Sequence, residues 1–265
     1  MKSRAIITTT ILAISLIGSA TFAATMRCEV AGPQTPRDIT RKDGQNRAAF
    51  PLAPAFTEMN LCNIHTHTNA ENKGPDFSIH VGNFRNGGYA CNETNSLTKE
   101  QLKDPMKGKG AYKGVKPGDT IEVHWVYSSC DVQPGNGLGA CLSDTCKDPK
   151  LRVESQVFLL VNDPYALDFN NYTNKADKKN GVYQARAIPT DMGNPIVFRG
   201  STTGPSYNEK ICSPAQVTWS IRPQCAKLDI SSLHTWAESN VFNETMSYGV
   251  RQLVTNPKLL SPMER

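Results

Sequence analysis

Short stretches in which apolar and polar residues alternate dominate the chain. Residues 77–82 and 217–221 alternate in this way, which predicts strands with one buried face. Residues 121–126 are apolar and β-branched, and residues 153–161 form a longer apolar-rich run that predicts a central strand. Because many short strands occur with few helical signals, the pattern predicts a mainly β fold, α+β with few helices.

Helical signals are confined to two places. Residues 98–102 predict a short helix with Thr98 as its cap, and a second helix is expected to begin near Ser232. Residues 28–54 are rich in proline, glycine and charge, so we expect an irregular arm over the surface. Residues 130–149 are glycine-rich and carry three cysteines, which indicates a loop held by a disulfide. A phosphate-binding loop is not expected, because the Gly-Lys-Ser/Thr ending is missing.

The first 23 residues have the features of a targeting segment. Lys2 and Arg4 give a basic start, an apolar run too short for a membrane span follows, and Ala23 is the small residue that a signal peptidase needs. We therefore predict a signal peptide over residues 1–23 and one domain over residues 24–265. No second apolar run of membrane length follows, so we expect an exported protein without a membrane span, either periplasmic or secreted.

Charge and cysteine content agree with export and give no reason to expect nucleic acid as a partner. Without the predicted signal peptide the chain has 27 basic and 24 acidic residues, a net charge of +3, and no clustered basic stripe. All eight cysteines lie after that segment. An even number in an oxidising compartment indicates disulfides, with 105 pairings to choose from. No Cys-x-x-Cys pair occurs, so a zinc ribbon is not expected.

Two histidines, His65 and His67, lie two residues apart in the stretch 63–67. If this stretch is a strand, both imidazoles leave the same face, from Cα atoms roughly 7 Å apart. Two rings at that spacing can converge on one metal ion about 2 Å from each nitrogen. The alternative for this pair alone is two histidines on a solvated strand face.

A third histidine, His124, lies in the predicted strand of residues 121–126 and can supply a third ligand from a neighbouring position in the sheet. Glu122 shares its face, and its carboxylate can accept the imidazole N–H that does not point at the metal. A solvated carboxylate is the alternative for Glu122. Three neutral histidines with an open fourth position are typical of a catalytic zinc site, although such a site also accepts cobalt or cadmium.

Three segments, in order, resemble the α-type carbonic anhydrases. Cys28 followed by Gln-Thr-Pro-Arg-Asp-Ile at residues 34–39 is similar to the family's N-terminal cysteine and Gln-Ser-Pro-Ile-Asp-Ile. The His-x-His of residues 65–67 and the Glu-x-His of residues 122–124 resemble the two ligand strands. Gly-Ser-Thr-Thr-Gly-Pro at residues 200–205 is similar to the family's Gly-Ser-x-Thr-Thr-Pro-Pro.

The spacing departs from the α-type pattern. The segment before the His-x-His strand is shorter, the gap between the ligand strands is longer, and the threonine turn has lost a residue and a proline. Residues 69–74 and 124–130 look more like the δ-class carbonic anhydrases, and the chain is identified as a member of that class. The resemblance runs from Cys28 to Trp219. It implies a single domain around a large, mostly antiparallel twisted sheet of the carbonic anhydrase type.

The resemblance also implies an activity, which is the zinc-dependent, reversible hydration of carbon dioxide to bicarbonate and a proton by zinc-bound hydroxide. Zn²⁺ is then the cofactor held by His65, His67 and His124, and carbon dioxide and bicarbonate are the substrates. Because carbon dioxide is apolar, we expect Val126, on the same strand face as His124, to line one wall of the site; a plain core valine is the alternative. The sequence does not indicate an oligomeric state.

In α-type enzymes a threonine accepts a hydrogen bond from the zinc-bound hydroxide and donates its own proton to a buried glutamate. When the turn is aligned on Pro205, the resemblance assigns this threonine to Thr202, with Thr203 as the second choice. For the glutamate we choose Glu71, four residues after His67. A surface loop carboxylate is the alternative for Glu71.

The proton shuttle of the α-type enzymes is a histidine in the region that this chain has shortened. His80 and His234 are candidates for a replacement. His80 lies on the polar face of the predicted strand at residues 77–82, where no role at all is the alternative. The shuttle is therefore left unassigned.

The resemblance implies one disulfide. Exported α-type enzymes bridge positions similar to Cys28 and Cys212, so we expect that pair. For Cys130 the sequence leaves two partners open, Cys141 and Cys146.

Two other functions fit some of the same residues. His65, His67 and Glu71 match the cupin spacing His-x-His-x₃-Glu, but the usual Pro-x-Gly-x-x-His is absent before His124. The other alternative is a non-catalytic exported module that binds zinc or a partner, although such relatives lose a zinc histidine and this chain has all three.

Overall fold

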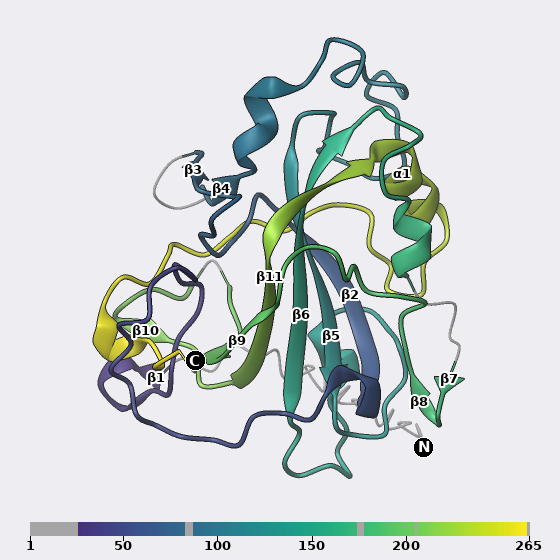
Figure 1. The fold of residues 1–265 in the computed structure, drawn as a ribbon. Helices are drawn as coiled ribbons and strands as arrows, with labels where there is room; N and C mark the ends of the chain where they lie inside the picture. The colour runs from purple at the N-terminus through teal and green to yellow at the C-terminus, as the bar shows by residue number, and fades with distance from the viewer. Residues whose placement is uncertain (1–25, 83–86, 174–177, 205, 264–265) are drawn as a thin grey trace, which may run out of the picture.

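The computed structural model describes residues 26–82, 87–173, 178–204 and 206–263 (Figure 1). The predicted signal peptide lies outside these residues. The largest sheet has five strands in the order β2-β5-β6-β11-β9, namely β2 (Asn60–Thr68), β5 (Thr120–Ser128), β6 (Leu151–Val161), β11 (Gln216–Asp229) and β9 (Ile196–Ser201). All neighbours are antiparallel except β6 and β11. The predicted mainly β fold with a mostly antiparallel sheet is therefore confirmed.

The other elements are short. Three two-stranded sheets pair β1 (Met26–Arg27) with β10 (Ile211–Cys212), β3 (Ile79–His80) with β4 (Tyr89–Ala90), and β7 (Lys178–Lys179) with β8 (Val182–Tyr183). The 3₁₀ helices are η1 (Cys28–Val30), η2 (Phe56–Glu58), η3 (Asn92–Ser96), η4 (Leu138–Cys141), η5 (Phe169–Tyr172) and η6 (Pro257–Leu259). Among the described residues α1 (Ile230–Glu238) is the one α-helix. No helix in this part of the chain has the length and apolar character needed to cross a membrane.

The two faces of the large sheet have different roles, which β5 shows most clearly. Odd-numbered residues from 121 to 127 pack in a hydrophobic core that also contains Trp236 of α1. Glu122, His124 and Val126 leave the opposite face, because successive side chains in a strand alternate. β6 is the middle strand, as its apolar run predicts. The sheet thus packs against α1 on one face, and its other face carries the histidines beside a second hydrophobic cluster that includes Val126 and Trp219.

The predicted helix at residues 98–102 is wrong. The structure has a single turn, in which the side chains of Thr98 and Gln101 each accept the other's backbone N–H at 3.2 Å. Pro105 follows and lacks the N–H that another helical turn needs. The second predicted helix is present as α1 and begins at Ile230, two residues earlier than expected.

Two predicted strands differ in length from their sequence patterns. Residues 77–82 pair with a neighbour only at β3, because the Ser78 N–H donates to Asn92 Oδ1 at 3.0 Å instead of to a strand. The alternating pattern of residues 217–221 is only the start of a strand, since β11 continues to Asp229. The part beyond the pattern pairs in parallel with β6.

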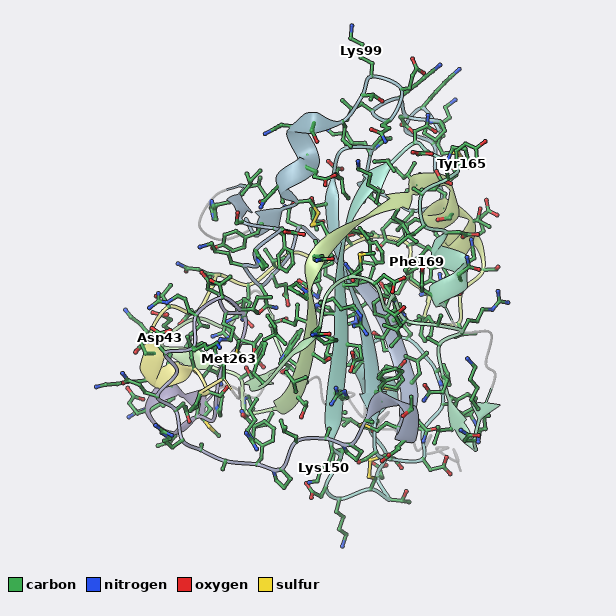
Figure 2. All side chains as sticks on the ribbon, viewed as in Figure 1. Asp43, Lys99, Lys150, Tyr165, Phe169 and Met263 are labelled. Atoms are coloured by element: carbon green, nitrogen blue, oxygen red, sulfur yellow. A yellow bond between two sulfur atoms is a disulfide. The ribbon has the colours of Figure 1, made fainter. Side chains whose placement is uncertain are left out.

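Four disulfides, drawn as yellow bonds in Figure 2, pair all eight cysteines, and they are Cys28–Cys212, Cys62–Cys141, Cys91–Cys225 and Cys130–Cys146. The first is the pairing that the resemblance implies, and the last is one of the two left open for Cys130. Cys28–Cys212 spans 184 residues, so it stabilises the fold by on the order of 4–5 kcal/mol in the chain-entropy model. Four disulfides in one chain are typical of a protein in an oxidising environment.

Candidate metal centre

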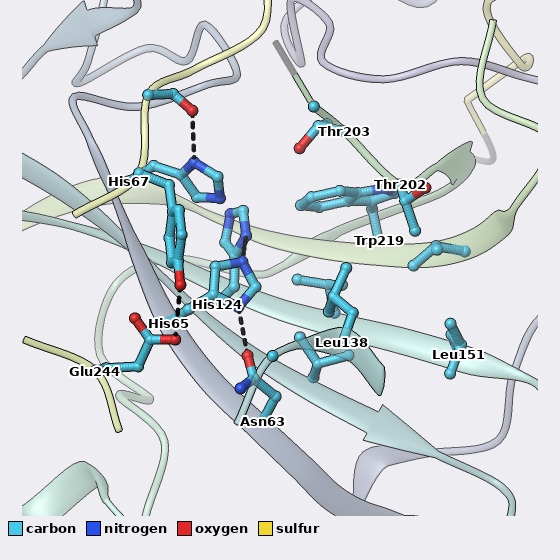
Figure 3. Close-up of a pocket in the computed structure, with 17 residues that line it drawn as sticks. Asn63, His65, His67, His124, Leu138, Leu151, Thr202, Thr203, Trp219 and Glu244 are labelled. Atoms are coloured by element: carbon cyan, nitrogen blue, oxygen red, sulfur yellow. Dashed lines mark hydrogen bonds between the residues drawn. The ribbon is translucent and has the colours of Figure 1, made fainter. Parts of the chain in front are cut away.

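Three histidines meet on the face of the sheet opposite α1 (Figure 3). β2 and β5 are antiparallel, with His65 directly opposite His124 and His67 opposite Glu122. The ring centroids are 5.1 Å apart for His65 and His67, 5.1 Å for His65 and His124, and 4.7 Å for His67 and His124. One nitrogen of each ring lies within 4.8 Å of the other two, so the three rings can share one metal ion.

Neighbouring oxygens orient the two histidines of β2. His65 Nδ1 lies 2.6 Å from Asn63 Oδ1, and His67 Nδ1 lies 3.2 Å from the carbonyl oxygen of Gly249. Both oxygens accept a ring N–H, which leaves each Nε2 with a free lone pair. Asn63 is itself fixed, because its Nδ2 donates to the Gly135 carbonyl at 3.1 Å. The Nε2 atom of His67 is buried without a hydrogen-bond partner among the described residues, and a metal ion would satisfy it.

His124 presents its Nδ1 atom to the site, whereas the two histidines of β2 present Nε2. Its Nε2 lies 3.3 Å from Oε1 of Glu122, and its Nδ1 lies 3.3 Å from Nε2 of His65. Ligands about 2.0–2.1 Å from zinc at the corners of a tetrahedron are about 3.3–3.4 Å from one another. The separation of these two nitrogens therefore fits zinc, and the donor set of three imidazoles fits it as well.

The charge state of the site also suits a metal. Burial lowers the pKa of His65 well below its ordinary value and lowers the pKa of His67, which favours the neutral rings that bind metals. Burial alone would raise the pKa of Glu122, but His124 and the Ser155 hydroxyl, which donates to this carboxylate, hold that pKa below its ordinary value. Glu122 is thus an ionised group beside His124.

Glu71 bonds to Thr203 and not to Thr202. The Thr203 hydroxyl donates to the two carboxylate oxygens of Glu71, with Oγ1 at 2.9 and 3.0 Å from them. Thr202 points toward Ser213, and the two Oγ atoms are 2.8 Å apart. The contact with Glu71 that the resemblance implies for Thr202 is therefore made by its neighbour, because side chains along an extended backbone alternate. The second choice, Thr203, has the expected contact.

Glu71 lies behind the metal ligands. It is 1% exposed, and burial raises its pKa to about 7. Its backbone N–H donates to Oε2 of Glu122 at 2.6 Å, so the two buried carboxylates belong to one network. Its Oε1 lies 3.4 Å from Nδ1 of His67, the nitrogen on the far side of that ring from the free Nε2. The carboxylates of Glu71 and Glu122 lie within 4.8 Å of one nitrogen of His124, but Glu71 does not join His65 and His67 in one ligand set as a cupin-type ligand would.

A cavity of about 290 Å³ opens onto the histidines. Its apolar wall comes from β5, η4, β6 and β11 and consists of Val126, Leu138, Leu151, Val153, Val217 and Trp219. Val126 thus lines the cavity, as its place on the His124 face predicts. Figure 3 shows Leu138, Leu151 and Trp219 on the side of the cavity facing the histidines.

The two histidines considered for proton transfer lie outside this cavity. His80 is exposed, with its ring 5.6 Å from that of Tyr89. His234 lies in α1, where its Nδ1 accepts the Tyr112 N–H at 3.1 Å. Neither lines the cavity, so neither is in place to exchange protons with its contents directly.

Several residues of the site were missed by sequence analysis. Asn63 has a recognisable signal, since it lies two residues before His65 on the same strand face. Glu244, Tyr248 and Gly249 line the cavity from a segment near the C-terminus. That segment has no regular apolar pattern, so its place beside β2 could not be read from the sequence.

Comparison with known proteins supports one family. The model of the Delta carbonic anhydrase family matches residues 56–232, more than half of the chain and including both histidine strands. An α-carbonic anhydrase from Photobacterium profundum is similar at 17% identity over 83% of this chain and 86% of that one, with a TM-score of 0.28. No curated protein matches the chain significantly. From the family match, the chain belongs to the Delta carbonic anhydrases.

Proposed function

We propose that the chain hydrates carbon dioxide reversibly to bicarbonate and a proton, with zinc held by His65, His67 and His124. The observation that carries this proposal is the convergence of three histidine nitrogens beside a cavity with an apolar wall. Zinc bound by three histidines lowers the pKa of a water in its open position to about 7, which supplies a nucleophile at neutral pH.

The cavity wall suits the substrate. Carbon dioxide has no net charge or dipole and gains little from polar partners, so an apolar surface next to the nucleophile favours it over water. Val126 and Trp219 are both at most 2% exposed, and the Trp219 ring lies 5.1 Å from that of His124. We assign these two side chains to the part of the wall that places the substrate carbon.

Thr203 and Glu71 are assigned to orienting the nucleophile. Because the Thr203 proton is committed to the Glu71 carboxylate, the Thr203 oxygen is left to accept a hydrogen bond from the attacking oxygen. That acceptor fixes the direction of the attacking lone pair, and orientation of this kind lowers the barrier.

The two alternative functions have less support. A cupin-type centre would need Glu71 in one ligand set with His65 and His67, whereas the Glu71 carboxylate accepts the Thr203 hydroxyl and groups only with Glu122 and His124. A non-catalytic module would have no use for an accessible cavity over the three histidines, and the family match indicates an enzyme.

A stopped-flow assay of carbon dioxide hydration tests the proposal. The purified protein should accelerate hydration, a chelator should abolish the acceleration, and added zinc should restore it, because the nucleophile depends on the metal. A chain that contains zinc and leaves the uncatalysed rate unchanged would refute the function.

We also propose that the mature chain acts outside the cytoplasm, in the periplasm or as a secreted protein. The predicted signal peptide at residues 1–23 and the four disulfides support this location.

A further inference from the structure

A buried acid, Glu244, lines the same cavity as the three histidines. It is 2% exposed, and Figure 3 labels it among the residues that line the cavity. It belongs to neither ligand strand nor the Glu71 network, and it lies beyond the residues that match the family. The proposed function so far leaves this carboxyl without a role.

The only side chain among the described residues that hydrogen-bonds the Glu244 carboxyl is a tyrosine. Tyr248 Oη donates to Glu244 Oε1 at 3.3 Å, and no cationic side chain in this part of the chain pairs with Glu244. Burial accordingly raises the pKa of Glu244 to about 7, and the Tyr248 bond opposes the rise. A carboxyl in this state exchanges its proton near neutral pH.

The backbone holds Glu244 and Tyr248 in place. Asn240 accepts the Glu244 N–H at 3.0 Å and donates to the Glu244 carbonyl at 2.9 Å. The Tyr248 N–H donates to the Thr66 carbonyl at 2.9 Å, and the Thr68 N–H donates to the Tyr248 carbonyl at 2.8 Å. The segment is thereby fixed to the free edge of β2, the strand that carries His65 and His67.

Tyr248, the partner of Glu244, also reaches solvent. Tyr248 is 47% exposed while its ring lies 6.0 Å from that of His65 and 6.2 Å from that of His67. It therefore spans the distance between the histidines and the cavity mouth. Glu244 itself is buried, so its exchange of protons with bulk water runs through the cavity that it and Tyr248 line.

We propose that Glu244 is the proton acceptor of this site and that Tyr248 positions it. This role rests on the proposed hydration of carbon dioxide. The cavity water that becomes the nucleophile loses a proton, directly or through another water, and the Glu244 carboxylate becomes a neutral acid. The acid then gives the proton to a base in solvent at the cavity mouth, and the carboxylate is restored.

An activity measurement separates this role from a structural one. In Glu244→Gln, kcat for hydration should fall by about a hundredfold, the lower end of what a positioned acid or base contributes. kcat/KM should be unchanged, because the steps from substrate binding to bicarbonate formation do not include release of the proton to solvent. A small base such as imidazole should restore kcat. Glu238→Gln, which changes an exposed glutamate of α1, is the control and should leave both constants unchanged.

A second measurement needs neither metal nor activity. The infrared band of protonated carboxyl groups in metal-free protein should titrate near pH 7 with contributions from Glu244 and from Glu71, whose pKa burial also raises to about 7. The component that is lost in Glu244→Gln and kept in Glu71→Gln belongs to Glu244. Tyr248→Phe should move this component to higher pH, because the lost bond stabilises the carboxylate. Tyr248 and Tyr112, the titratable groups that interact with Glu244, both stay protonated in this range. The histidines of the same cavity also titrate, and burial holds the pKa values of His65 and His67 below the ordinary value.

The outcomes are distinct. If wild-type protein is active and Glu244→Gln keeps the wild-type kcat, or if the infrared component is unchanged in that variant, Glu244 is not the acceptor and the proposed function stands. If zinc-loaded wild-type protein does not hydrate carbon dioxide, the proposed function fails and this role fails with it.

Discussion

Replacing His65, His67 or His124 with alanine is expected to remove most of the zinc from the purified protein and to abolish catalysed hydration. Each variant deletes one of three nitrogens that lie within 4.8 Å of one another. The two nitrogens that remain should bind the metal too weakly to retain it when the protein is diluted. Loss of a hydrogen-bond partner behind a ligand typically costs about 10–100-fold in metal affinity. Loss of a ligand should therefore cost more than about a hundredfold.

Asn63→Ala is the matched control for these variants. It leaves all three ring nitrogens and removes the oxygen 2.6 Å from His65 Nδ1, together with the amide bond to Gly135, so it should stay within that 10–100-fold range. Metal content after dialysis and a competition titration with a chelator measure both effects. A histidine variant that keeps one zinc per chain with wild-type affinity would remove that residue from the ligand set.

The second large effect is expected at the pair Thr203 and Glu71. Thr203→Ala and Glu71→Gln should each lower kcat by roughly tenfold to a thousandfold, as loss of one catalytic hydrogen bond does. Zinc content should not change, because neither side chain supplies a converging nitrogen. Since the two act through one chain of hydrogen bonds, the double variant should lose less than the product of the single losses.

Thr202→Ala distinguishes this arrangement from a general disturbance of the turn. The Thr202 hydroxyl bonds Ser213, so its removal should change kcat far less than Thr203→Ala does. Steady-state kinetics on the four variants and wild type, at equal zinc content, give the comparison. Equal losses for Thr202→Ala and Thr203→Ala would show that the bond to Glu71 has no special part in catalysis.

The histidine face could be predicted because it depends on the simplest property of a strand. Side chains alternate with a period of two, so Glu122, His124 and Val126 had to share a face once residues 121–126 formed a strand. The apolar residues between them, Val123 and Trp125, are buried on the side of α1. Local pattern and burial agree here, and the prediction needs no knowledge of the distant chain.

The parts that were missed depend on contacts between distant segments. Gly249 reaches His67 across 182 positions of the sequence, and Glu244 and Tyr248 arrive with the same irregular segment. Thr202 and Thr203 are alike in the sequence, and only the position of Glu71 distinguishes them. In the same way, two of the four disulfides follow from the finished fold and from no local signal.

The most direct test of the central claim is the zinc K-edge X-ray absorption spectrum of the wild-type protein. If His65, His67 and His124 hold the metal, the spectrum should show four nitrogen or oxygen neighbours at about 2.0–2.1 Å, three of them with the outer scattering of imidazole rings. Sulfur neighbours at about 2.3 Å, or fewer than three imidazoles, would contradict the three-histidine centre and the function built on it.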